Sequence, residues 1–136
     1  MKKMVLALLV TSSIAFAGTY TKEDRVKDMH KMADAMGTIQ TGFFFNNYET
    51  VASGVNALTD AAQRVQPPLE VLQEKNPMAR YMNQKVKMTN KVVKKINQKA
   101  LTILQRFKSG DSSQAIQAYS KIVDQCMKCH QQMRMW

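Results

Sequence analysis

The sequence predicts an all-α protein that folds as an antiparallel four-helix bundle. Apolar residues recur at three- and four-residue spacing through four separate segments, which is the periodicity of one face of an α-helix. Residues that cap or break helices lie between these segments. No stretch has the strict alternation of a half-buried strand, and short first and third connections favour antiparallel neighbours.

The first helix is expected to begin after Thr21, because Thr21 and Asp24 have the spacing of a capping box. Its apolar face consists of residues three and four positions apart: Val26, Met29, Met32, Met36, Ile39 and Phe43. Asn46 and Asn47 end this helix, and the Asn47 side chain can cap the next one.

The second helix follows Asn47 and ends before Pro67-Pro68, since the residue before a proline is disfavoured in the α region. Its apolar face has a strict four-three alternation, which is typical of bundle packing: Val51, Val55, Leu58, Ala62 and Val65. Residues 68–76 are expected to form an irregular crossover.

Asn76-Pro77 supplies a cap and a first-turn proline for the third helix. The apolar residues of this helix are Met82, Val86, Val93, Ile96, Ala100, Ile103, Leu104 and Phe107. Ser109-Gly110 ends it, because glycine readily adopts the left-handed conformation. Asp111 and Gln114 then have capping-box spacing, and the last helix runs through Ala115, Ala118, Ile122, Cys126 and Cys129.

The N-terminus has the three parts of a secretory signal peptide. Lys2 and Lys3 form a basic region, residues 4–10 are apolar, and Ala15-Phe16-Ala17 fits a cleavage site. A membrane anchor needs about 20 apolar residues, and polar residues 11–13 interrupt this run. We expect cleavage after Ala17, a periplasmic location, and one domain over residues 18–136 with no membrane span.

The C-terminal segment contains Cys126-Met127-Lys128-Cys129-His130, a C-x-x-C-H motif. This motif attaches c-type haem: both thiols become thioethers to the porphyrin, and the histidine ligates iron. On a helix, the two cysteines and His130 share one face. A redox dithiol would need a βαβ setting, and a zinc site would need four ligands, whereas the only other Cys or His is His30. The sequence therefore predicts one covalent haem c, bound by the C-terminal helix through His130.

This architecture and three residue patterns resemble the class II c-type cytochromes, the cytochrome c′ family. Besides the haem motif, His130 followed by Arg134 matches a C-H-x-x-x-R pattern, and Arg25 followed by Met29 matches R-x-x-x-[L/M] on the first helix. The resemblance covers residues 18–136. It implies that Met29 faces the distal side of the iron. Arg25 and Arg134 are expected to pair with the haem propionates; the alternative for each is a solvated surface arginine.

The resemblance also implies two sub-types, which differ at the sixth iron position. One has a methionine ligand and carries electrons; the other has an open iron and binds nitric oxide or carbon monoxide. Met29 is the favoured ligand here, with Met32 and Met36 as alternatives on the same face, and all three could instead be ordinary core residues. His30 is expected to face solvent rather than iron.

The leading prediction is a periplasmic mono-haem electron carrier without enzymatic activity, and the gas-binding protein is its alternative. A haem-free interaction protein whose C-x-x-C motif binds metal transiently is a third reading.

The third helix is strongly basic. Between Lys75 and Lys108 lie only positive charges, on Lys75, Arg80, Lys85, Lys87, Lys91, Lys94, Lys95, Lys99, Arg106 and Lys108. These charges could simply form the solvated face of a helix, or they could form a surface that docks an acidic redox partner. Anionic lipid is a second candidate for this surface, and nucleic acid is not expected.

Three consecutive aromatic residues, Phe43-Phe44-Phe45, precede the first turn. These rings would suit the interface of a homodimer, or they could cap the protein's own core. We expect at least two of them to cap the core.

Overall fold

A computed structural model describes residues 20–67 and 77–134, apart from the side chains of Ala79 and Arg134. It contains four α-helices: α1 (Lys22–Phe44), α2 (Tyr48–Arg64), α3 (Pro77–Lys108) and α4 (Ser112–Arg134). These residues contain no strand, so the all-α prediction is confirmed. The predicted signal peptide and the crossover at residues 68–76 lie outside the described residues. No described helix has the length and apolar character needed to cross a membrane.

Local side-chain hydrogen bonds fix the starts of the first two helices. The Thr21 hydroxyl accepts the Asp24 N–H at 3.1 Å, and the Asp24 carboxylate accepts the Thr21 N–H at 3.0 Å. At α2, the Asn47 side-chain oxygen accepts the Thr50 N–H at 3.0 Å. Each bond satisfies a donor that the helix itself leaves unpaired, so both predicted caps are confirmed.

Two residues in the left-handed conformation turn the chain between paired helices. Asn46, with φ of 47°, separates α1 from α2, and Gly110, with φ of 82°, separates α3 from α4. Asparagine and glycine tolerate this conformation better than other residues. After Gly110, the Asp111 carboxylate accepts the Gln114 N–H at 3.1 Å and caps α4.

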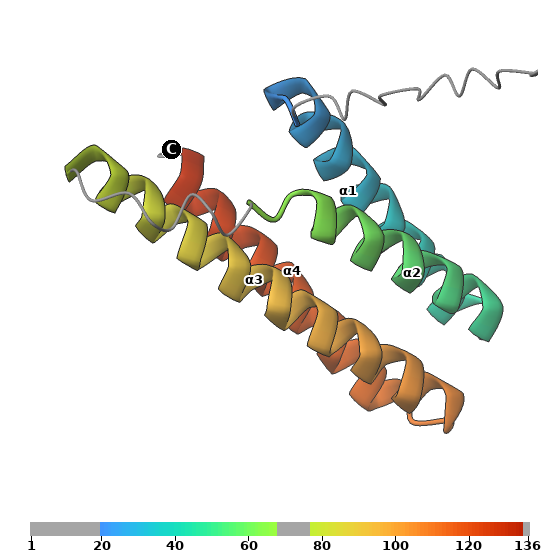
Figure 1. The fold of residues 1–136 in the computed structure, drawn as a ribbon. Helices are drawn as coiled ribbons and strands as arrows, with labels where there is room; N and C mark the ends of the chain where they lie inside the picture. The colour runs from blue at the N-terminus through green and yellow to red at the C-terminus, as the bar shows by residue number, and fades with distance from the viewer. Residues whose placement is uncertain (1–19, 68–76, 135–136) are drawn as a thin grey trace, which may run out of the picture.

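The helices form two hairpins that lie side by side (Figure 1), and one cluster of buried side chains joins them. The closely packed pairs are α1 with α2, α3 with α4, and α2 with α3. Fully buried aliphatic side chains from all four helices meet between them, and the largest are Ile39, Val51, Val55, Leu58, Ile96, Ile103 and Ile122. Both tight turns lie at one end of the molecule, which we call the loop end (Figure 1).

The α1–α2 contact depends on two glycines. A methyl group at Gly54 would lie 2.8 Å from the Ile39 backbone nitrogen and 2.9 Å from the Ala35 carbonyl oxygen. At Gly42 it would lie 2.7 Å from the Val51 backbone nitrogen. These distances are shorter than a carbon side chain tolerates, so the two helices can approach this closely only because both positions lack a Cβ.

Some apolar residues lie outside the core that the sequence pattern predicts. Val26 is 45% exposed and Met82 is 50% exposed. Of the aromatic triple, only Phe43 packs inward, with ring centroids 5.3 Å from Phe107 and 5.8 Å from Tyr119. Phe44 and Phe45 are each 78% exposed, so the expectation that at least two rings cap the core is wrong.

Candidate functional site

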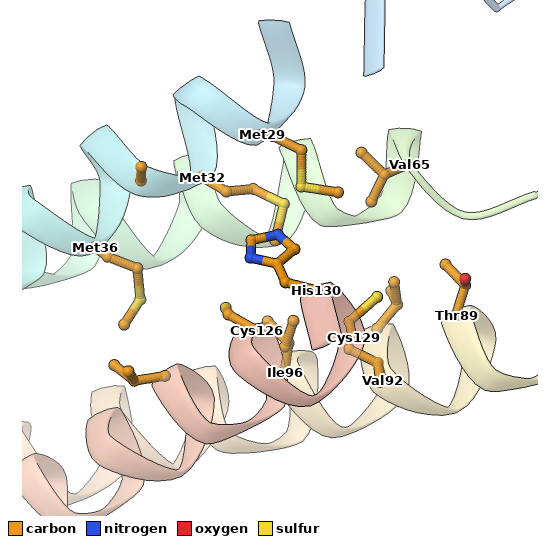
Figure 2. Close-up of a pocket in the computed structure, with 13 residues that line it drawn as sticks. Met29, Met32, Met36, Val65, Thr89, Val92, Ile96, Cys126, Cys129 and His130 are labelled. Carbon is orange, nitrogen blue, oxygen red and sulfur yellow. The ribbon is translucent and has the colours of Figure 1, made fainter. Parts of the chain in front are cut away.

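An apolar hollow of about 220 Å³ lies between α1 and α4 (Figure 2). From α4, Cys126, Cys129 and His130 line it, and from α1 come the methionines. The full lining is Met29, Met32, Ala33, Met36, Val65, Thr89, Val92, Val93, Ile96, Val123, Cys126, Cys129 and His130. The hollow thus brings the complete C-x-x-C-H motif against the methionine face of the first helix.

The spacing of the residues explains this meeting of side chains. Cys126, Cys129 and His130 are three and one positions apart, so one turn of α4 directs all three toward α1. Met29, Met32 and Met36 are three and four apart on the facing side of α1. The α1–α4 pair is not among the closely packed pairs of the described helices, whereas α2 and α3 close the hollow from behind with Val65 and Ile96.

A second, wider hollow of about 510 Å³ adjoins the first on the side away from the core. Met29, Ala33, Val65, Thr89, Cys129 and His130 line both hollows. The outer one adds the cationic Lys22 and Arg25, together with His30 and Met133. The site therefore changes from an apolar interior to a basic rim, which suits a flat ligand with an apolar body and an acidic edge.

Both cysteines are free, half-buried thiols. Burial raises the pKa of the Cys126 thiol, and the neighbouring Cys129 raises it further. Burial also raises the pKa of the Cys129 thiol, while the positive charge of Lys85 acts in the opposite direction. Both thiols are therefore protonated at neutral pH, and they contribute no charge to the hollow.

Thr89 is the polar side chain in the wall of the inner hollow formed by α3. It is buried, and its hydroxyl donates to the Lys85 carbonyl oxygen at 3.0 Å. Because the hydroxyl hydrogen is already used within the helix, the Thr89 oxygen can only accept a hydrogen bond from a ligand. The imidazole of His130 is then the strongest hydrogen-bonding or metal-binding group among the residues of the inner hollow.

The predicted site residues fall into three groups. Cys126, Cys129, His130 and Met29 lie together around the inner hollow, and the alternative ligands Met32 and Met36 line it as well. Met32 is buried, whereas Met29 and Met36 are half-buried. Arg25 lies on the basic rim, with its guanidinium carbon 6.0 Å from the centre of the Tyr20 ring. The side chain of Arg134 lies outside the described residues, although its backbone belongs to α4.

His30 is exposed, as the sequence analysis expects, but it also lines the outer hollow together with His130. One turn of α1 therefore offers Met29 to the inner hollow and His30 to the outer one. His30 was expected only to face solvent, and the structure also places it in the wall of the outer hollow.

A buried carboxylate next to Met29 fixes the start of α1 against α2. Asp28 is 3% exposed; it accepts from Arg64 Nε at 3.0 Å and from the Tyr20 hydroxyl at 3.1 Å. Burial alone would raise the pKa of Asp28, but the hydrogen bonds from Arg64 and Tyr20 outweigh it and the net pKa is lowered. Burial and the bond to Asp28 together raise the pKa of Tyr20 to about 12.

Sequence reasoning missed this anchor and much of the cavity wall. Asp28 lies among charged residues in the sequence, and only the long-range partner Arg64 marks it as structural. Ala33 and Val65 are small or aliphatic residues with no chemical signal of their own. Ala33 lies on an exposed side of α1, and its part in the cavity wall becomes evident only when the position of α4 is known.

The donor set fits a haem group better than a bare metal ion. In the part of the chain that the structure describes, no three His, Cys, Asp or Glu side chains lie close enough to hold a metal ion. The hollow instead combines one imidazole with two thiols and several thioethers in apolar surroundings. A porphyrin brings four nitrogen ligands of its own, so it needs only one or two axial ligands from the protein.

Comparison of this chain with protein-family models, with curated proteins and with solved structures finds no match.

Proposed function

We propose that this protein is an exported, periplasmic mono-haem c-type cytochrome that carries single electrons between redox partners. In this proposal its helices form a four-helix bundle, with haem c held by Cys126 and Cys129 and its iron bound by His130 and Met29. The observation that carries the proposal is the shared hollow: the haem motif of α4 and the thioether of Met29 on α1 line one apolar cavity. The resemblance to class II c-type cytochromes, found in the sequence, agrees with it.

His130 and Met29 line both the inner and the outer hollow from opposite helices. A planar group placed across this boundary would have the imidazole on one face and the thioether on the other. Haem, when bound, supplies one-electron chemistry between ferrous and ferric iron, and a His/Met ligand pair raises its reduction potential. The aliphatic walls would keep water away, which limits reorganisation when the charge on the site changes.

The basic rim supports the orientation of such a group. Lys22 and Arg25 line the outer hollow, where they would neutralise the acidic propionates of a porphyrin whose apolar body occupies the interior. Arg134, one turn beyond His130, is proposed as a second propionate partner from the pattern of the sequence.

The second candidate function is the binding of nitric oxide or carbon monoxide by five-coordinate haem. The observation that favours it is the lining of the inner hollow on the α1 side, where Met32, Met36 and Ala33 line the hollow together with Met29. If the Met29 sulfur only lines this space, a diatomic ligand has an apolar chamber in which to bind iron.

The first experiment tests whether the secreted product carries haem, which both candidate functions require. The chain is expressed with its N-terminal segment in a host that attaches haem c, and the product is weighed by mass spectrometry. We expect the mass of one haem above that of the polypeptide, and none in the Cys126→Ser/Cys129→Ser control. A product without added mass, made while the host matures another c-type cytochrome, contradicts the proposal.

Absorption spectra then identify the axial ligand. Low-spin bands and a methionine-to-ferric-iron charge-transfer band indicate the electron carrier. High-spin bands and rapid uptake of carbon monoxide indicate the gas binder. Met29→Ala should convert low spin to high spin, whereas Met36→Ala, a matched change on the same helix face, should leave the spectrum unchanged. If Met36→Ala alone converted the spectrum to high spin, Met36 rather than Met29 would be the axial ligand.

A further inference from the structure

We propose that the acidic redox partner docks in a groove between α3 and α4, directly behind the haem site. This inference rests on the proposed electron-carrier function and gives the partner a place on the surface. The groove is a hollow of about 360 Å³ with Lys87, Lys91, Lys95 and Lys128 on its walls, and we call it the lysine groove. Its lining also includes the buried Val92 of α3 and Gln125 of α4.

Three of these lysines form a continuous positive stripe. Lys87, Lys91 and Lys95 are four positions apart, so they lie on one face of α3 over about 12 Å of helix. None of the three forms an ion pair with a described residue, and α3 itself contains no acidic residue. Lys128, on the opposite wall, is paired with Asp124 at 2.7 Å, so its charge is partly neutralised.

The lysine groove and the inner hollow share one wall residue, Val92. Cys126, Cys129 and His130 line the same hollow. Gln125 is 8% exposed and precedes Cys126 in the chain. A partner seated in the groove would therefore stand close to the bound haem, and electron transfer becomes faster as the path through protein shortens.

The shape of the groove favours an acidic protein over a lipid surface. The groove is a concavity between two helices with the apolar Val92 and Met88 among its lining, and it can admit protruding carboxylate side chains. A bilayer presents a broad plane of charge, which would contact the outward lysines of α3 as readily as those in the groove. Complementary charge mainly raises the rate of encounter and selects the face that docks.

The test compares two triple variants with the same change of net charge. The groove variant is Lys87→Gln/Lys91→Gln/Lys95→Gln, and the control is Lys94→Gln/Lys99→Gln/Lys108→Gln, whose lysines lie on α3 outside the groove. The probe is a hexaglutamate peptide added to the full secreted chain. Binding is followed by NMR shifts of backbone amides.

We expect shifts confined mainly to residues 87–95 and 125–132. The groove variant should weaken binding about tenfold and the control less than about twofold, at low salt. Oxidation of the ferrous protein by hexacyanoferrate(III) is the second readout. One electron leaves the iron, giving ferric protein and hexacyanoferrate(II), and the groove variant should slow this step by a similar factor.

Equal weakening by both variants would overturn the proposal, because it would show a diffuse attraction by the whole helix. Binding to phosphatidylglycerol vesicles but not to the peptide, with equal sensitivity to both variants, would overturn it in favour of a membrane surface. A chain that takes up haem but shows no groove effect refutes the docking site alone. Localised peptide binding by a chain that carries no haem refutes the proposed function while the acidic docking surface stands.

Discussion

The two ends of this molecule are packed in opposite ways. At the loop end, Phe43, Phe107 and Tyr119 bring aromatic rings from three helices into contact. At the opposite end, which we call the site end, α1 and α4 instead leave an apolar hollow lined by methionine and cysteine. The same α1 helix therefore packs closely at one end and stays apart from α4 at the other, which indicates that the hollow is a specific feature rather than a sign of generally loose packing.

The largest expected effect is at the loop end. Phe43→Ala should remove two ring contacts and lower the free energy of unfolding by about 3 kcal/mol, because the void left by a large side chain closes only in part. Phe44→Ala is the matched control; that ring is 78% exposed, and its loss should change stability by less than about 0.5 kcal/mol. Urea unfolding measures both, and equal effects would contradict the described packing of Phe43.

The next effect tests the close contact between α1 and α2. Gly54→Ala should destabilise the protein by about 2 kcal/mol, because the new methyl group meets the backbone of Ile39 and Ala35 and forces the helices apart. Gly37→Ala, on the free side of α1, meets nothing within 4 Å and should stabilise by up to about 1 kcal/mol through helix propensity. Thermal unfolding of the two variants should shift in opposite directions; a shift in the same direction contradicts the geometry.

The ion pair at the site end gives a smaller effect that depends on pH. Because the folded-state pKa of Asp28 is lowered, its carboxylate stabilises the fold above the unfolded pKa of about 3.9, and this contribution is lost as the pH falls through the folded pKa. At pH 7, Asp28→Asn should cost about 1 kcal/mol, since the bond from Arg64 loses its charged acceptor. The difference between the two proteins should shrink below about pH 4.

Asp34→Asn is the control for this titration. Asp34 is exposed on the same helix, and its carboxylate forms no ion pair with any residue that the structure describes. The free energy of unfolding of Asp34→Asn should equal that of the unsubstituted protein across the same pH range. A gap between Asp28→Asn and the unsubstituted protein that widens in acid would contradict the assigned role of Asp28.

The smallest effect on stability is expected from filling the hollow. Ala33→Leu adds bulk to a residue that lines both hollows, and without haem it should change the free energy of unfolding by less than about 0.5 kcal/mol. The same change should reduce the fraction of secreted protein that carries haem. Ala57→Leu, on an exposed position of α2, should leave that fraction unchanged, as measured by the ratio of haem absorbance to protein mass.

Local features could be predicted from residue patterns alone, whereas a long-range feature could be predicted only where a family resemblance indicated it. The caps at Thr21 and Asn47 and the left-handed Gly110 depend only on residues within one turn, and all three are confirmed. The grouping of Met29 with the C-x-x-C-H motif came from a family resemblance, and the structure places these side chains around one hollow.

The failures have a common physical cause. Val26 has the helical spacing of a core residue, but at the site end no packed helix covers it, and it lines the outer hollow instead. Phe44 and Phe45 continue an aromatic run but lie where the helix ends and no neighbour covers them. Periodicity identifies the face of a helix, whereas the length over which that face is covered depends on the partner helix.

Two opposite walls of the inner hollow come from the first and the last helix, with Met29 and His130 about 100 positions apart in the chain. Each hairpin pairs two helices that follow one another in the chain, so we expect the hairpins to form before the hollow, whose opposite walls are much farther apart in sequence. A cofactor bound to both walls would act as a cross-link that closes a very long loop, which restricts the unfolded chain. Native-state hydrogen exchange should then show its largest gain in protection, on haem binding, at the facing ends of α1 and α4.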